Sequence, residues 1–447
     1  MKSIRIANGQ GFWGDSIDAP EKLIQYGDID YLTLDYLAEV TLSIMQRQKL
    51  KNPELGYALD FVDLIDNNLE LVIKNKIKII CNAGGVNPHK CKEKLSEIAK
   101  KKNIDLKIAV IEGDDIFGSL DSFMGLGQQF SNLSNGKSFD AIRNNVYSAN
   151  VYIDSFTIAE ALAMGADIVI CGRVSDPGLV VGPCIYEFGI KKDDYNMLAS
   201  ATVAGHILEC GAQTTGGNHS NWHDIDDFSN LGYPIAEIKE NGIFDIKKPP
   251  RTGGLINKQV VTEQILYELG DPKCYISPDV CVDFTSIRLF DRGNDVVRVD
   301  NVKGFCPTDT YKVSITYFNG FKASSQLTIS GPDAIKKANV IKDAIWKKLE
   351  QNNCIYDAKS HELLGLSSCF KDMFDLKDDA KEVVLRLGVK GKCKKSIIRF
   401  TKELSPMITA GPPGVTGFSE GRPKVREIVA YWPTLIDKDL VKTSITL

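Results

Sequence analysis

The chain has 447 residues, of which 43% are hydrophobic and 25% charged, with a formal net charge of −4. This length exceeds what one hydrophobic core usually serves, so we expect two domains. The sequence has no long Lys/Arg run, and no apolar stretch approaches the ~20 residues that span a bilayer. We therefore expect a globular protein with no nucleic-acid partner and no membrane association.

The N-terminal stretch "MKSIRIANGQGFWGD" predicts a first strand and its turn, without the layout of a signal peptide. The 11 cysteines are scattered without C-x-x-C pairs, and Cys81 and Cys171 lie in apolar runs. This pattern is typical of reduced, buried thiols, so we expect a cytoplasmic protein.

The first half of the chain alternates strand-like and helix-like segments. Continuous apolar runs predict the strands, which are 3–8, 29–34, 76–85, 106–115 and 166–173. Helical spacing and helix-ending residues predict helices at 18–27, 36–50, 54–74, 88–102, 155–165 and 192–212. This alternation predicts an α/β domain over residues 1–235, with a doubly wound and mainly parallel sheet.

The pattern changes after residues 236–250, which end in two prolines and are expected to be a connector. Long β-rich segments follow at 280–291, 295–305 and 310–331, and another strand is expected at 382–391. Residues 332–351 have the spacing of an amphipathic helix. We expect residues 251–447 to form an α+β domain with a mainly antiparallel sheet.

Polar residues and glycines follow most of the predicted parallel strands. Ligands bind beyond the carboxyl ends of such strands, so we expect a pocket there. Strand-to-helix turns also need glycine and Asn or Asp caps, and for any single loop this structural explanation is the better one. The candidate substrate-binding residues of the α/β domain are Asn8, Asn82, Gly84, Gly85 and Asn150. "NGQGFWGD" also matches G-x-G-x-x-G, but bulky residues at Phe12 and Trp13 make a dinucleotide site the weaker interpretation.

Arg173 directly follows a predicted strand, where its guanidinium could hold a carboxylate or phosphate at two points. A salt bridge to Asp176 is an equally good interpretation. Asp35 and Glu39 are one helical turn apart and could be a base and its partner or metal ligands, although Asp35 is also a natural N-cap.

His206 and Glu209 are spaced for one helix face, where a histidine–carboxylate pair can move protons or bind a metal. A hydrogen-bonded polar face is the commoner explanation. In "GGNHSNWHDIDD", His219 and His223 suggest a metal site, but no further ligands line up, and we interpret the stretch as a polar loop. We therefore assign no metal ligands.

The segment "TAGPPGVTGFSEGRPKVRE" has four glycines between Gly411 and Gly421, and it lacks the Gly-Lys-Ser/Thr ending of a Walker loop. A pocket lid or phosphate-binding loop would use Gly414, Gly417 and Arg422, whereas the alternative is a segment that packs on the C-terminal sheet and binds nothing. We expect a pocket between the two domains, with Arg173 on its floor and residues 411–421 in its wall.

Several motifs together resemble the acyclic terpene utilisation protein A family, in order from about residue 4 to about residue 435. They include "IRIANGQGFWGD", "DYLAEVTLSIM", "NAGGVNP", "GADIVICGRVSDPGLVVGP", "AGHILECGAQTTGG" and "GPPGVTGFSEGRP". The resemblance implies a catabolic enzyme of branched-chain or isoprenoid acids, often handled as coenzyme A thioesters. It also implies a small ferredoxin-like-fold module, which we expect here as a separate partner subunit.

The resemblance and the polar strand ends together predict a lyase of hydratase or dehydratase type. Its substrate would be a small branched unsaturated acid or its CoA thioester. The predicted catalytic residues are Asp35, Glu39, Arg173, Asp176, His206 and Glu209. The alternatives are a CoA-thioester hydrolase or carbon–carbon lyase, which a nucleophilic cysteine would support, and a non-catalytic subunit of a catabolic complex. The cofactor stays open, with a divalent metal as one candidate, and we expect a homo-oligomer.

Overall fold

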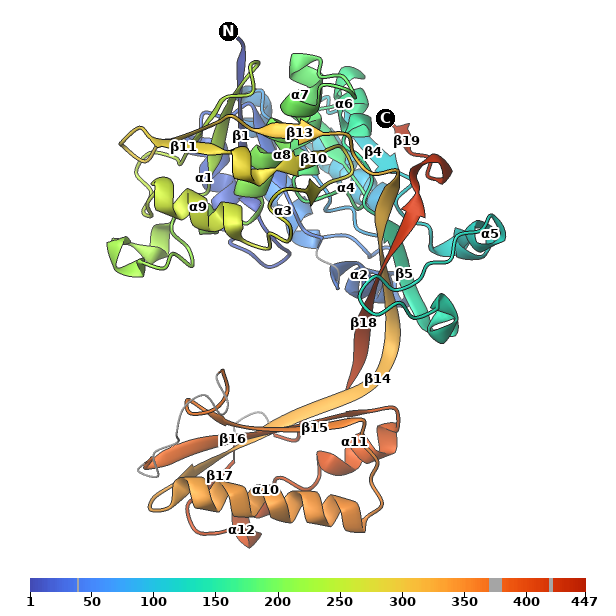
Figure 1. Ribbon diagram of the computed structural model, residues 1–447, viewed down its shortest axis with the longest axis vertical. Helices are drawn as coiled ribbons and strands as arrows, with labels where there is room; N and C mark the ends of the chain where they lie inside the picture. The colour runs from blue at the N-terminus through green and yellow to red at the C-terminus, as the bar shows by residue number, and fades with distance from the viewer. Residues whose placement is uncertain (38–39, 370–379, 418–420) are drawn as a thin grey trace. The chain divides into compact units, whose positions relative to one another are not determined.

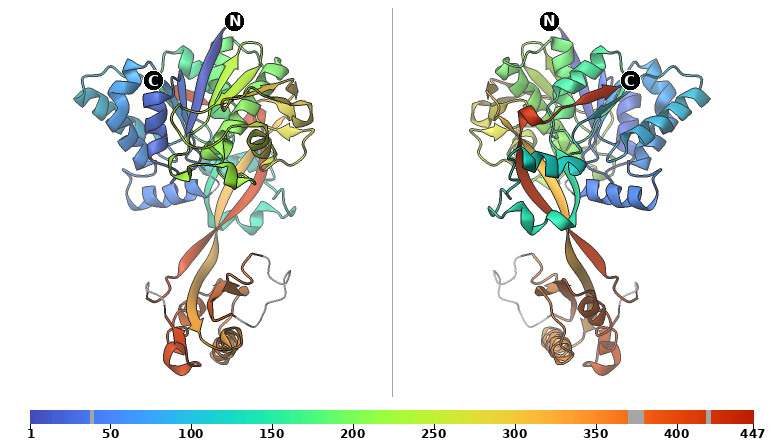
Figure 2. Two further views of the ribbon diagram at one scale, coloured as in Figure 1. Left: turned by 90° about the vertical axis from the view of Figure 1, so that its left-hand side faces the viewer. Right: turned by 90° about the vertical axis from the view of Figure 1, so that its right-hand side faces the viewer.

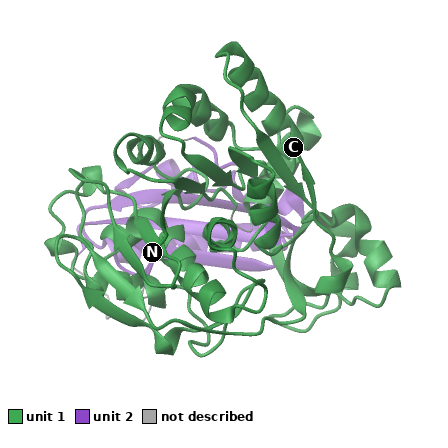
Figure 3. Ribbon diagram, turned by 90° about the horizontal axis from the view of Figure 1, so that it is seen from above, with its two compact units in different colours: residues 1–316, 431–447 green, residues 317–430 purple. Residues whose placement is uncertain are grey.

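The computed structural model describes residues 1–37, 40–369, 380–417 and 421–447. The chain divides into two compact units (Figure 3). Unit 1 comprises residues 1–316 and 431–447, and unit 2 comprises residues 317–430. No helix in the described ranges is both long enough and apolar enough to cross a membrane.

Unit 1 is built on a ten-stranded sheet of order β11-β12-β8-β7-β1-β2-β3-β6-β4-β19 (Figure 1). The strands from β1 to β4 in this order pair in parallel, and the outer strands on both sides pair antiparallel. The parallel strands are β1 (Ser3–Gln10), β2 (Tyr31–Leu34), β3 (Lys78–Cys81), β4 (Ile108–Glu112) and β6 (Ile168–Ile170). The antiparallel strands are β7 (Ile235–Lys239), β8 (Phe244–Lys247), β11 (Arg288–Asp291), β12 (Val297–Asp300) and β19 (Ser444–Thr446).

Helices cover both faces of the parallel strands (Figure 2). Apolar residues of α1, α3 and α4 share one buried cluster with Leu32, Ile79 and Ile170 of the sheet. Helices α6, α7 and α8 contact the same strands and are not part of that cluster. The helices of unit 1 are α1 (Asp18–Tyr26), α2 (Thr41–Lys51), α3 (Leu59–Lys74), α4 (Pro88–Lys101), α5 (Leu120–Gly125), α6 (Phe156–Ala163), α7 (Gly178–Phe188), α8 (Tyr195–Glu209) and α9 (Lys258–Leu266). Because both faces are covered, all four residues of β2 are buried, as the continuous apolar run predicted.

Two smaller sets of strands complete unit 1. β9 (Tyr275–Ile276), β10 (Cys281–Asp283) and β13 (Lys303–Phe305) form a three-stranded sheet. β5 (Val146–Val151) pairs with β14 (Thr310–Ser330), and β18 (Arg426–Asp437) pairs with β14 as well. The boundaries between the two units therefore fall inside β14 and β18.

The expected class, a mixed α/β protein, is confirmed, but the chain is partitioned differently from the expectation. Residues 236–250 are not a connector, because β7 and β8 pair with each other and β7 pairs with β1 of the main sheet. Residues 251–316 belong to unit 1, because β12 pairs with β8 and extends that sheet. Helix α7 was not expected, since its sequence is apolar on all sides and contains Pro183.

Unit 2 consists of a sheet of order β15-β16-β14-β17, with helix α10 on one face. Its remaining elements are α10 (Ala334–Gln351), β15 (Ala358–Leu364), β16 (Glu382–Gly391), α11 (Lys394–Phe400), α12 (Met407–Ala410) and β17 (Val415–Thr416). Alternate residues of β16, such as Leu385 and Leu387, are buried in one apolar cluster with Ile341 and Ile345 of α10. The antiparallel α+β character expected for this part of the chain describes unit 2.

We predict that Gly205→Ala destabilises unit 1, because α8 lies directly against the segment that leads into α7. A Cβ at Gly205 would lie 2.6 Å from the Cα of Pro177. We expect a loss of about 1–3 kcal/mol in the free energy of unfolding, measured by denaturant titration. Gly125→Ala, where a Cβ would meet nothing within 4 Å, is the matched control and should cause no loss. Equal losses in both variants would contradict the packing argument.

Candidate functional site

Charged and polar side chains gather where the parallel strands of unit 1 end. Asp35 follows β2, Asn82 follows β3, Asp114 follows β4 and Arg173 follows β6. All four residues are buried, with exposed fractions between 1% and 5%. Parallel pairing of adjacent strands brings these residues to one edge of the sheet, as the sequence predicted.

Arg173 is the centre of this group. Its Nη2 donates to Oδ1 of Asp176 at 2.6 Å, and its Nη1 donates to the carbonyl oxygen of Leu37. Its guanidinium carbon lies 4.2 Å from the centre of the Tyr152 ring, which supplies a cation–π contact. Burial opposes the charge, but Asp176, Tyr152 and Asp35 raise the pKa of Arg173 well above its ordinary value. The salt bridge to Asp176 is therefore the interpretation that the structure bears out, and both Nη atoms are already engaged.

Asp35 lies beside the Arg173 guanidinium, and the pKa of its carboxyl group is raised. Its Oδ1 accepts hydrogen bonds from Nδ2 of Asn82 at 2.7 Å and from the backbone N–H of Leu37 at 3.0 Å. Burial and the negative charge of Asp176 raise the pKa of Asp35 to about 7, although Arg173 and Asn82 act in the opposite direction. Asp35 is not a helix N-cap, because α2 begins only at Thr41. At neutral pH its carboxyl group therefore populates both protonation states.

Asp114 holds the loop that carries Arg173. Its Oδ2 accepts from the backbone N–H of Arg173 at 2.7 Å and from Nδ2 of Asn150 at 2.9 Å. Gly172 permits this approach, because a Cβ at that position would overlap the Asp114 carboxylate. Burial raises the pKa of Asp114 to about 6, against the hydrogen bonds from Arg173 and Asn150.

His206 and Glu209 extend the group along α8. Nδ1 of His206 lies 3.0 Å from Oε1 of Glu209, and Nε2 lies 3.3 Å from the carbonyl oxygen of Ile265. Burial opposes protonation of His206, but the Glu209 carboxylate raises its pKa above the ordinary value. Burial also raises the pKa of Glu209, with a further contribution from Asp176. Because the two groups are this close, they titrate as a pair rather than independently.

Asn8 ties this helix to the sheet. Its Nδ2 donates to the carbonyl oxygens of Leu208 at 2.9 Å and Glu209 at 3.0 Å, so the end of β1 fixes the end of α8. In the described part of the chain, Nε of Arg173, Oδ1 of Asn150 and Oε2 of Glu209 are buried and make no hydrogen bond. Buried polar atoms without partners are uncommon and call for an explanation, of which an absent ligand or water is one.

The structure thus brings together most of the residues singled out in the α/β part of the sequence. Asp35, Arg173, Asp176, His206 and Glu209 form one neighbourhood. Asp114 was not selected as a site residue from the sequence, although its place after a predicted strand was a usable signal. Tyr152 was also missed, because no motif or spacing marked it. Glu39 lies outside the described residues.

The glycines proposed to bind substrate have packing roles of their own. Gly84 lies against Ile170 and Pro88, and Gly85 lies against Met45 and the carbonyl oxygen of Gly56. In unit 2, the N–H of Ser330 donates to the carbonyl oxygen of Gly414 at 2.9 Å, and Gly417 lies near Ile408. Arg422 also belongs to unit 2. That Arg173 and residues 411–421 share one pocket stays a prediction.

The histidine-rich stretch is tied to helix α9. Nδ1 of His219 lies 2.8 Å from Oε2 of Glu263, and the His223 ring stacks on Trp222 with a centroid distance of 3.7 Å. Among the described residues, no three His, Cys, Asp or Glu side chains are grouped so that they could hold a metal ion. Cys81 and Cys171, which lie near strand ends, are both fully buried. Burial raises the pKa of Cys81 to about 12 and that of Cys171 well above its ordinary value. Thiols in such surroundings are usually inert.

Comparison with known proteins establishes the family. The family model described as acyclic terpene utilisation family protein AtuA matches residues 4–447. The chain belongs to this family. The family's name refers to acyclic terpene utilisation, which is a catabolic process. The AtuA match extends over both compact units, and so it includes both the buried group of unit 1 and the glycine-rich segment of unit 2.

Two further comparisons add no functional information about this AtuA-family chain. A search of curated proteins finds no match. The crystal structure of S. aureus homoserine dehydrogenase aligns over 92% of this chain and 84% of its own, with 10% identity and a TM-score of 0.15. A TM-score this low supports no conclusion about fold or activity.

We predict that Asp35 makes folding stability depend on pH. Its folded-state pKa of about 7 exceeds its ordinary value of 3.8, so its stabilising contribution is present below the ordinary value and is lost as pH rises through about 7. Asp35→Asn removes this titration next to Arg173, Asp176 and Asn82. The melting temperature of the wild type should therefore fall relative to that of Asp35→Asn between about pH 5 and about pH 8. Parallel curves for the two proteins would show that Asp35 titrates normally.

Proposed function

We propose that this AtuA-family chain is a hydro-lyase that adds water to, or removes it from, a small branched unsaturated carboxylic acid or its CoA thioester. The observation that carries the proposal is Asp35, a buried carboxyl group with a pKa of about 7 beside Arg173. A general acid–base works best when its pKa lies near the working pH. The catabolic context comes from the family.

The proposed reaction needs one proton at the α-carbon and one hydroxyl group at the β-carbon. In hydration, the oxygen of water bonds to the β-carbon and gives up a proton, while the α-carbon accepts a proton as the double bond becomes single. Asp35 in its protonated form would supply the α-proton. The His206–Glu209 pair, with Nδ1 and Oε1 3.0 Å apart, would take the proton from water. Dehydration reverses both transfers.

Arg173 would bind the acid through a position that a carboxylate already fills. Asp176 accepts a 2.6 Å hydrogen bond from Nη2 of Arg173, and its side chain is 42% exposed. Asp176 can therefore turn toward solvent, and a substrate carboxylate or thioester oxygen would replace it with an equivalent hydrogen bond. This exchange places the substrate next to Asp35. A substrate carboxylate would bring its own negative charge in place of that of Asp176, which is one cause of the raised Asp35 pKa.

The partner subunit and the thioester form of the substrate rest on the family resemblance alone. The assay should therefore be run with and without a small ferredoxin-like-fold subunit and with and without a divalent metal. The expected homo-oligomeric state should be measured on the same sample. The first measurement is loss of the ultraviolet absorbance of conjugated acids and enoyl thioesters, with products identified by mass spectrometry.

We predict that Asp35→Asn lowers kcat for the identified substrate by about 10²–10⁴-fold, the usual contribution of general acid–base catalysis. The matched control is Asp63→Asn, which removes one exposed carboxylate on α3 and should leave kcat unchanged. Circular dichroism would verify that both variants are folded. If Asp35→Asn keeps full activity, the site is elsewhere. If the wild type transforms none of the acids or thioesters with metals and the partner subunit supplied, the proposed reaction is wrong.

A further inference from the structure

Unit 2 covers one face of its sheet with α10 and presents the opposite face as three rows of paired residues. Strand register places Ala358, Lys390 and Lys322 in one row. The next row consists of Ser360, Gly388 and Ser324, and the third of Glu362, Arg386 and Gln326. The intervening residues of β14 and β16, including Leu327, Leu385 and Leu387, are in the apolar cluster beneath α10. The two faces of this sheet therefore have opposite character.

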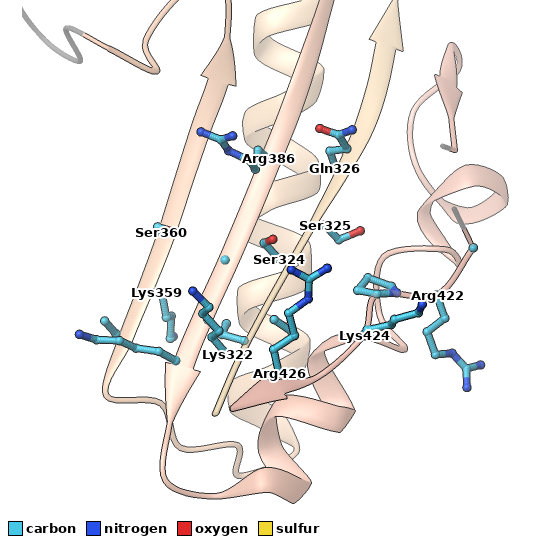
Figure 4. Close-up of a pocket in the computed structure, with 17 residues that line it drawn as sticks. Lys322, Ser324, Ser325, Gln326, Lys359, Ser360, Arg386, Arg422, Lys424 and Arg426 are labelled. Carbon is cyan, nitrogen blue, oxygen red and sulfur yellow. The ribbon is translucent and has the colours of Figure 1, made fainter. Parts of the chain in front are cut away.

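The polar face carries a hollow of about 1150 Å³. Its lining comes from β14, β15, β16 and the segment 421–426, all within unit 2. Figure 4 shows Lys322, Arg386 and Arg426 over these strands, with Arg422 at the edge. The described lining contains seven Lys and Arg residues and neither Asp nor Glu. A surface concavity lined by one sign of charge concentrates ions of the opposite sign.

Most of these cations have no counter-charge within the described chain. Arg386 pairs with Glu362, and Lys359 is 2.8 Å from Glu350 of α10. The five other cations, none of which forms an ion pair with a described residue, are Lys322, Lys390, Arg422, Lys424 and Arg426. Lys322 and Lys390 are direct cross-strand neighbours, an arrangement that destabilises a sheet. An anion bound between them would remove this repulsion.

The floor of the hollow suits phosphate oxygens better than an apolar or aromatic group. The middle row offers the hydroxyl groups of Ser324 and Ser360 on either side of Gly388. A Cβ at Gly388 would lie 2.6 Å from Oγ of Ser360. The absence of a side chain at this position therefore leaves space above the middle row. The described lining includes no aromatic residue on which a nucleic-acid base could stack. Hydroxyl donors beneath lysine and arginine side chains favour a compact, multiply charged anion.

We propose that this hollow binds a small molecule through two linked phosphate groups, with Lys322 and Lys390 on either side of the phosphates. The site is separate from the chemistry proposed for Asp35 and does not depend on it. Of the residues that line the hollow, only Gly421, as part of the segment 411–421, and Arg422 were selected from the sequence. A nucleotide-type ligand would use this site for its phosphates, since the lining offers nothing for a base.

The test is calorimetric titration of the full-length chain with inorganic pyrophosphate, ADP and coenzyme A at low ionic strength. The double variant Lys322→Gln/Lys390→Gln should weaken pyrophosphate binding about tenfold or more. The control Lys336→Gln/Lys347→Gln removes the same charge from exposed positions on α10, beyond the other face of the sheet, and should change affinity by less than about twofold. Pyrophosphate should also raise the melting temperature of the wild type and of the control more than that of Lys322→Gln/Lys390→Gln.

Three results would overturn the proposal. The first is no saturable binding of any of the three phosphate compounds by the wild type. The second is equal affinity in the wild type and in a folded Lys322→Gln/Lys390→Gln variant, which would place the anion elsewhere. The third is tighter binding of a single-stranded oligonucleotide or an acidic peptide than of all three phosphate compounds, which would identify a macromolecular partner. None of these results depends on hydratase activity, so failure here is distinct from failure of the proposed function.

Discussion

Burial of the Arg173 guanidinium constrains the strand ends of unit 1 more than any other interaction. A buried charge left without partners costs several kcal/mol, on the order of 3–5. Three groups stabilise the buried guanidinium. The Leu37 carbonyl oxygen and the Asp176 carboxylate accept hydrogen bonds from it, and the Tyr152 ring makes a cation–π contact with it. These partners come from different parts of the chain, so they converge only when β2, β6 and the segment after β5 reach their native positions. The fold and the electrostatic setting of the site are therefore fixed together.

The burial that surrounds Arg173 also raises the pKa values of its acidic neighbours. Burial raises the pKa of Asp35 to about 7 and that of Asp114 to about 6, and Asp35 retains enough hydrogen bonds to stay in a fixed orientation. Such carboxyl groups reduce stability at neutral pH, because the folded state resists their ionisation. Carboxyl groups with pKa values shifted in this way are common at functional sites, which is why Asp35 was chosen for the proposed reaction.

The sequence predicted the parts of this arrangement that follow from local pattern. Apolar runs located β2, β3, β4 and β6. The rule that ligands bind at the carboxyl ends of parallel strands selected Asp35, Asn82 and Arg173. The spacing of His206 and Glu209 correctly placed them on one helix face. Local pattern could not decide whether Arg173 forms a salt bridge with Asp176 or is free to bind a substrate. That choice depends on the conformation of the loop between β6 and α7.

Other features depended on pairing between distant segments and were beyond local pattern. The prolines at 249 and 250 suggested a connector, yet the preceding residues are a hairpin paired to β1. The basic face of unit 2 is assembled from Lys322, Lys390 and Arg386, which lie on two strands, and from residues 422–426. A search for consecutive Lys and Arg residues cannot find such a patch. Alternation along 322–326 and 386–390 was the signal, but only strand register shows that the two segments meet.

Unit 2 is contained, in sequence, within unit 1, and this arrangement has a consequence for synthesis of the chain. Residues 431–447 return to unit 1 after unit 2 is complete, and β19 pairs with β4 at one edge of the ten-stranded sheet. A nascent chain emerging from the ribosome therefore carries an unpaired β4 edge until β19 has been made. Exposed strand edges are templates for association with other chains. The interval between the emergence of β4 and that of β19 is thus the period in which this edge is open to pairing with another chain.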